Sequence, residues 1–105
     1  MGFDLPEPDV DLLRRLLRGF PEIDTAIVFG SRAKGNARPG ADIDLALKGS
    51  EVTDQTVLNL VNALEELPLP YFFDVVAYQD IQNQDLVSHI NRVGQVLYRR
   101  GETIS

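Results

Sequence analysis

Two aspartates one residue apart, Asp42 and Asp44, begin an apolar stretch that continues as Leu45-Ala46-Leu47. Successive side chains of a β-strand point to opposite faces. Both carboxylates are therefore expected on one face, with Ile43 and Leu45 turned towards a core. Two carboxylates so close together repel each other unless a proton or a cation lies between them. The pair thus indicates a site for a divalent cation with oxygen ligands.

A third carboxylate, Asp74, is the one charged side chain in the apolar stretch 71–78. A buried carboxylate without a partner would be costly. Either arginine or backbone donors satisfy Asp74, or it joins Asp42 and Asp44 from a neighbouring strand. The second arrangement suits Mg²⁺, which binds a few carboxylates together with phosphate oxygens and water. Two such ions can stabilise both the attacking and the leaving oxygen of a displacement at phosphorus.

The segment before the aspartates is rich in glycine and basic residues. A β-branched run over 25–29 ends at Gly30-Ser31, and Arg32 and Lys34 follow within a turn-rich loop. Exposed backbone N–H groups beside basic side chains favour phosphate binding. The sequence therefore predicts a phosphate site next to a metal site.

The elements that must position these residues follow from periodicity and from turn residues. Helices are expected from the N-cap Asp9 to Gly19, from Thr53 or Asp54 to the prolines at 68 and 70, and from Asp80 or Gln84 to Gly94; strands are expected over 25–29, 42–48 and 71–78. Arg14, Arg15 and Arg18 take the solvent side of the first helix, and Val96-Leu97-Tyr98 forms a short apolar tail segment. This order predicts an α+β fold, with a small mixed β-sheet and helices packed against it, as one domain over 1–105.

Composition limits the function classes. The chain has 105 residues, 44% hydrophobic residues and a net charge of −6, so extended nucleic-acid binding through a basic surface is not expected. With no cysteine and one histidine, His89, a disulfide or a zinc site is also not expected. No stretch is long and apolar enough to span a membrane, and a cytoplasmic protein is predicted.

These residues resemble the minimal nucleotidyltransferases of the DNA polymerase β-type superfamily. The motif of that family is Gly-Ser, ten residues, then Asp-x-Asp, with a third Asp on a later strand. Here Gly30-Ser31 is followed by residues 32–41, then Asp42-Ile43-Asp44, and Asp74 lies in Phe73-Asp74-Val75-Val76. The variant Gly-Ser-Arg-Ala-Lys-Gly is similar to the form common in the minimal group, and the likeness extends over nearly the whole chain.

The resemblance implies roles for individual residues. Gly30 would let the backbone approach phosphate, and Ser31 would bind the β- and γ-phosphates of ATP as substrate. Asp42 and Asp44 would bridge Mg²⁺, with two ions expected, and Asp74 would complete the second ion's shell and help deprotonate the attacking hydroxyl. Arg32 and Lys34 are candidates for neutralising the triphosphate.

The resemblance also implies a partner. Minimal members lack the added helical domain that helps hold substrate, and typically act with an all-helical HEPN protein in a hetero-oligomer. In such toxin–antitoxin pairs the nucleotidyltransferase transfers AMP from ATP to a tyrosine of the HEPN toxin and silences its RNase activity.

Other readings of the motifs are weaker. A P-loop would need Lys-Ser or Lys-Thr where Asn36-Ala37 stands, and an EF-hand would need a turn glycine and a terminal Glu ligand after Asp44. His89 reads as an exposed helical residue. Two other functions stay open: transfer to a small acceptor such as an aminoglycoside, and a non-catalytic module that binds a nucleotide or a partner.

Overall fold

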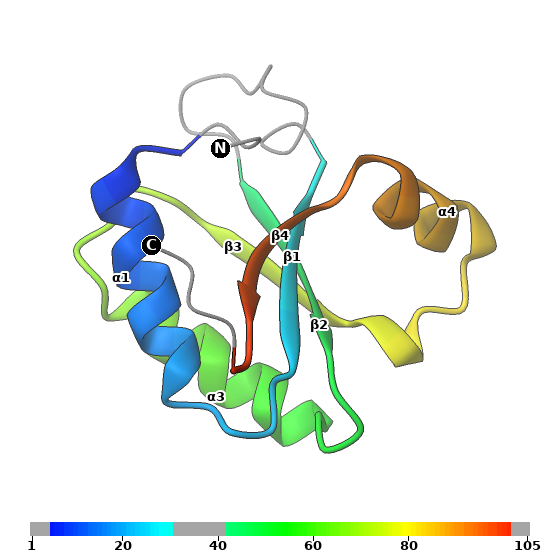
Figure 1. Ribbon diagram of the computed structural model, residues 1–105, viewed down its shortest axis with the longest axis horizontal. Helices are drawn as coiled ribbons and strands as arrows, with labels where there is room; N and C mark the ends of the chain where they lie inside the picture. The colour runs from blue at the N-terminus through cyan, green and yellow to red at the C-terminus, as the bar shows by residue number, and fades with distance from the viewer. Residues whose placement is uncertain (1–4, 31–41, 102–105) are drawn as a thin grey trace.

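The computed structural model describes residues 5–30 and 42–101. Within these ranges the chain forms a mixed sheet, three α-helices and one short 3₁₀ helix (Figure 1). In chain order the elements are α1 (Glu7–Arg18), β1 (Thr25–Phe29), β2 (Ile43–Lys48), α3 (Asp54–Glu65), β3 (Phe73–Ala77), η1 (Tyr78–Asp80), α4 (Gln84–Val93) and β4 (Gln95–Arg99). The predicted α+β class is confirmed.

The strand order, which the sequence did not reveal, is β3-β2-β1-β4. β1 pairs antiparallel with both β2 and β4, and β2 pairs parallel with β3. The parallel connection is made through α3, as a parallel pair requires a long crossover. The register of that pair matters for the site, because it sets Asp44 level with Asp74.

The sheet is covered differently on its two faces. α1 and α3 lie on one side and α4 on the other (Figure 1). The α1–α3 side holds the larger core, which includes Leu13, Leu17, Leu45, Leu60 and Leu97. The α4 side holds a small cluster of Ile27, Phe29, Ala46 and Ile90. These two sets follow the alternation of side chains along β1 and β2.

Local signals explain where the helices begin and end. Thr53 caps α3 in a capping box with Thr56, which satisfies backbone N–H groups that the first turn leaves free. Asn83 caps α4 through its side chain, and Gly94 ends that helix. The predicted cap of the first helix was wrong, because α1 begins earlier, after Pro6, and Asp9 lies in its first turn.

Two further predictions need correction. Arg14 does not face solvent: only 6% of it is exposed, and its Nε donates to the carbonyl oxygen of Leu97 at 2.8 Å. The apolar tail segment is a fourth strand, β4, which pairs with β1. These two errors have one cause, since the strand that completes the sheet beside α1 also supplies the carbonyl that draws Arg14 inwards.

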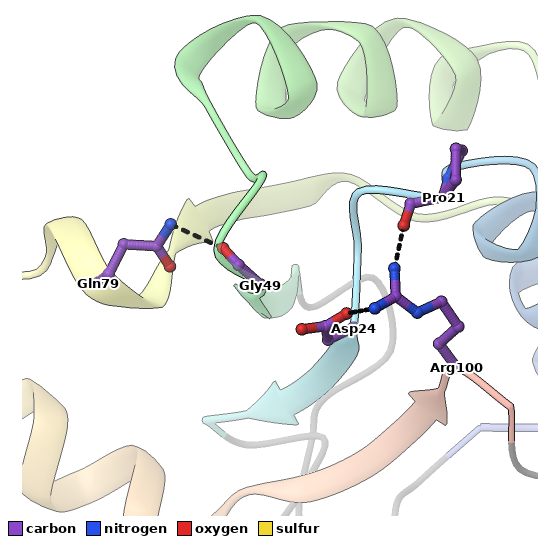
Figure 2. Close-up of polar contacts among 5 residues, drawn as sticks. All are labelled: Pro21, Asp24, Gly49, Gln79 and Arg100. Atoms are coloured by element: carbon purple, nitrogen blue, oxygen red, sulfur yellow. Dashed lines mark hydrogen bonds and ion pairs between the residues drawn. The ribbon is translucent and has the colours of Figure 1, made fainter.

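Polar contacts hold the end of the sheet opposite the site (Figure 2). The Arg100 guanidinium pairs with Asp24 and donates to the carbonyl oxygen of Pro21. Gln79 donates to the carbonyl oxygen of Gly49 at 3.0 Å and so ties η1 to the turn after β2. Both contacts join segments distant in sequence. In the described ranges, none of the helices is long and apolar enough to cross a membrane.

Candidate functional site

Alternation along β2 determines where its acidic residues point. Ile43, Leu45 and Leu47 lie in the core under α1 and α3, whereas Ala46 belongs to the cluster under α4. Asp44 alternates with Leu45 and therefore lies on the α4 face, and Asp42, just before the strand, is two residues away on the same side. Asp42 is exposed and Asp44 is half-buried.

The third carboxylate comes from the neighbouring strand. Asp74 of β3 is the register partner of Asp44 in the parallel pair, and partners in register project from the same face of a sheet. Its neighbours in sequence, Phe73 and Val75, pack against the opposite core. The apolar neighbours of Asp74 suggested that its carboxylate would be buried at a cost in free energy. Asp74 is exposed, so this cost does not arise. Asp42, Asp44 and Asp74 thus gather at one end of one face.

The electrostatics of Asp44 reflect this gathering. Burial raises the pKa of the Asp44 carboxyl above its ordinary value, and the negative charges of Asp74 and then Asp42 raise the pKa further. His89 acts in the opposite direction and lowers the pKa. A divalent cation among these carboxylates would remove the repulsion, and the donor set of carboxylate oxygens is the one that Mg²⁺ prefers.

The described side chains do not form a closed metal site by themselves. Over residues 5–30 and 42–101, no three His, Cys, Asp or Glu side chains are grouped so that they could hold a metal ion. Asp42 and Asp74 are exposed and therefore have room to reorient. The carboxylates fit a cation in chemistry and in the face they share, and their role as ligands remains a prediction.

Gly30 lies beside the side chain of Asp44. It directly follows β1 and has a φ of +80°, a conformation that residues other than glycine rarely adopt. A Cβ at this position would overlap Oδ2 of Asp44. Two requirements therefore favour glycine at this position: the positive φ of the chain bend, and the space that the Asp44 carboxylate occupies.

His89 is a neighbour of the site that the sequence interpretation missed. It is half-buried rather than exposed, and its ring lies edge-on to Phe29, with ring centroids 6.4 Å apart. Phe29 in turn is the register partner of Asp44 across β1 and β2. A signal was present, because His89 follows the inward Leu86 by three residues and so shares a helix face with it.

The other predicted site residues cannot be placed. Ser31, Arg32 and Lys34 lie in the segment 31–41, outside the described residues. Their assignment to phosphate binding therefore stays a prediction from the motif. Of the predicted residues in the described ranges, Gly30, Asp42, Asp44 and Asp74 all lie around the same end of β2.

Comparison with solved structures supports the fold. The chain is similar to a toxin–antitoxin structure with AMP-PNP (TM-score 0.71, 20% identity), covering 91% of this chain and 76% of that one. It is also similar to a structure of a tri-AMPylated Shewanella oneidensis HEPN toxin in complex with an MNT antitoxin (TM-score 0.67, 20% identity; 89% and 71% covered). A third similar structure is the MntA–HepT toxin–antitoxin (TM-score 0.61, 19% identity; 90% and 73% covered). At these identities the likeness shows the fold.

Sequence comparison identifies the family. No curated protein matches the chain significantly. The family model described as polymerase beta, nucleotidyltransferase, matches residues 11–103, which include both strands that carry the aspartates and the bend at Gly30. The chain therefore belongs to the polymerase β-type nucleotidyltransferase family.

Proposed function

We propose that this chain is a Mg²⁺-dependent adenylyltransferase that moves AMP from ATP to a tyrosine hydroxyl of a HEPN-type helical partner and thereby acts as an antitoxin. The observation that carries the proposal is the register of Asp44 with Asp74 on one sheet face, beside Asp42 and Gly30. The family match supports nucleotidyl transfer. The similar structures, in which MNT antitoxins accompany HEPN toxins, support the partner.

The proposed reaction exchanges two bonds at phosphorus. The acceptor oxygen bonds to the α-phosphorus of ATP, the bond from that phosphorus to the oxygen it shares with the β-phosphate breaks, and pyrophosphate leaves. Mg²⁺, when bound by Asp42, Asp44 and Asp74, would supply positive charge next to the triphosphate. Asp74, which is exposed and level with Asp44, is expected to help take up the hydroxyl proton.

Gly30 has a separate role in the proposal. Its missing side chain leaves the chain bend open beside Asp44, where phosphate oxygens can approach backbone N–H groups. Ser31 follows directly and is proposed to donate to the β- and γ-phosphates, with Arg32 and Lys34 near the same charge. We expect the reaction in the cytoplasm, where ATP is abundant.

The test follows the position of a radioactive label. The purified chain is incubated with Mg²⁺, a purified HEPN protein and ATP labelled at either the α- or the γ-phosphate. Transfer of AMP predicts label on the partner from α-labelled ATP alone, and mass spectrometry should locate it on a tyrosine. Label from γ-labelled ATP would instead indicate phosphoryl transfer and would overturn the proposal.

Variants connect the label to the site. Asp44→Asn is expected to lose transfer almost completely, because it removes a charge and an oxygen ligand from the centre of the set. Asp11→Asn is the matched control, since Asp11 is an exposed carboxylate on α1. Equal labelling by both variants would mean that the acidic cluster is not the site of transfer.

A further inference from the structure

One edge of the sheet is left open beside an apolar groove. β3 is one of the two outer strands of the sheet and, in the described part of the chain, pairs only with β2. A groove of about 620 Å³ runs along it and is lined by Val75, Val76 and Ala77 of the strand. An unpaired strand edge presents backbone N–H and C=O groups that another chain can bind. Here that edge carries no lysine or proline that would discourage pairing.

The groove has an apolar wall on each side of the strand. On one side are Val57, Leu58 and Val61 of α3, and 53% of Leu58 is exposed. On the other side are Ile81, which precedes α4, and Leu86, in the first turn of α4. α3 and α4 lie on opposite sides of the sheet (Figure 1). The groove therefore wraps around the strand edge instead of lying on one face.

The shape of the groove favours one conformation of a bound segment. Val75 packs with the core under α1 and α3, whereas Val76 packs with the cluster under α4. An extended segment lying beside β3 would alternate its side chains between the same two sides and fill both walls. A helix places its apolar residues on one face and would fill only one wall. The groove thus favours a strand.

The charge of the groove indicates which kind of chain can bind there. Two aspartates, Asp54 and Asp80, line the groove, and among the described residues that line it there is no Lys, Arg or His. A second copy of this chain would bring the same acidic residues to the same edge, so two copies would repel each other. A segment with Lys or Arg beside its apolar residues would be attracted.

We propose that the open edge of β3 binds an extended apolar segment of a partner protein, flanked by Lys or Arg, as an added strand of the sheet. Backbone hydrogen bonds to the edge would supply affinity, and the two apolar walls and the acidic residues would supply specificity. The groove-lining part of the strand begins at Val75, directly after Asp74 of the carboxylate site, and the test of binding does not depend on nucleotidyl transfer.

The test uses the full chain and a fluorescent synthetic peptide, Lys-Lys-Val-Val-Thr-Val-Val-Lys-Lys, which places valines on both sides of an extended strand. Fluorescence anisotropy should show saturable binding, and hydrogen exchange should show protection of the amides of β3 on binding. The same peptide with the nitrogens of all five central residues methylated should not bind, because neither of its edges keeps the backbone N–H groups that pair with a strand. Failure of the unmodified peptide to bind at millimolar concentration, or equal binding of the methylated one, would overturn the proposal.

Three variants locate the binding. Leu58→Ser should weaken binding about tenfold or more, because it removes apolar area from one wall. Phe72→Ser is the matched control: 77% of Phe72 is exposed, and this residue does not line the groove. Asp80→Lys should weaken binding of the lysine peptide and strengthen binding of the same peptide flanked by glutamates.

Circular dichroism first confirms that each variant is folded. Two other outcomes would then also overturn the proposal. If sedimentation shows that the wild-type chain is a dimer and that Leu58→Ser is a monomer, a second copy occupies the groove. If a helical peptide competes with the extended one at equal concentration, the occupant is not a strand.

Discussion

The two faces of the sheet use alternate residues of the same strand for opposite purposes. On the face under α1 and α3, Ile43, Leu45 and Leu47 are at most 1% exposed. On the other face, the neighbouring Asp44 is half-buried among like charges. The comparison shows that one face supplies stability and leaves the other free to hold groups that repel each other. Substitutions should therefore separate into losses of stability and losses of function according to face.

The largest effect on stability is expected at Leu45. Leu45→Ala leaves a cavity in the larger core and should lower the free energy of unfolding by about 2–5 kcal/mol. Urea denaturation measures the change, and Leu58→Ala, on the exposed side of α3, should change stability by about 0.5 kcal/mol or less. A loss below about 1 kcal/mol for Leu45→Ala would mean that the face under α1 and α3 is not the main source of stability.

A smaller loss of stability is expected at Arg14, a charged residue that is buried on the side of the sheet that α1 and α3 cover. Arg14→Met retains the long side chain but removes the donor to the buried carbonyl oxygen of Leu97. Leaving that oxygen without this donor should cost about 1–3 kcal/mol in urea denaturation. Arg15→Met is the control, because Arg15 is exposed on the same helix. Similar losses for both arginines would show that the contact with Leu97 is not important.

Much of this division was predictable from sequence. The period-two pattern of residues 42–47 placed the carboxylates and the aliphatic residues on opposite faces, and Thr53 and Gly94 marked helix ends correctly. These signals are local, because each depends on residues a few positions apart.

The remaining features depend on contacts between distant segments. Arg14 meets Leu97, and Asp44 meets Asp74, only because the strand order is β3-β2-β1-β4. Arg14 lies four residues after Val10 and three before Leu17, so helical spacing places it on the buried face of α1, but its acceptor, the carbonyl oxygen of Leu97, belongs to a distant segment. The position of His89 beside Phe29 depends in the same way on how α4 returns across the sheet. The sequence motif predicted the aspartates of the site, but it does not include His89, which lies near them.

A third prediction uses two glycines with almost the same backbone conformation. Gly30 has φ +80° and Gly101 has φ +79°, so alanine at either position should cost about 1–2 kcal/mol in backbone strain. Only at Gly30 would the new Cβ meet Asp44, since at Gly101 no atom of the described residues, apart from the chain neighbours, lies within 4 Å of it. Gly30→Ala should therefore lose nucleotidyl transfer, and Gly101→Ala should retain it, in the labelling assay. Retained transfer in Gly30→Ala would mean that the space beside Asp44 is not needed.

The smallest effect on stability is expected at Asp44 itself, and its sign should depend on pH. Because the pKa of Asp44 is raised in the folded state, the folded protein binds a proton at Asp44 more tightly than the unfolded chain does. The stability that this group contributes is thus present below its unfolded pKa of about 4 and is lost as pH rises through the folded pKa. With chelator present, Asp44→Asn should be slightly more stable than the wild type at neutral pH, and the difference should disappear below about pH 4.

Thermal unfolding at a series of pH values measures this difference. Asp11→Asn, on the outer side of α1, serves as the control, because Asp and Asn have similar helix propensities. Addition of Mg²⁺ with ATP should reverse the order, since a ligand that binds only the folded state stabilises the wild type, and Asp44→Asn lacks the charge to hold it. If Asp44→Asn were less stable than the wild type at neutral pH without metal, the carboxylate would be stabilising its own face. The two faces of the sheet would then not differ in the way that the repulsion around Asp44 indicates.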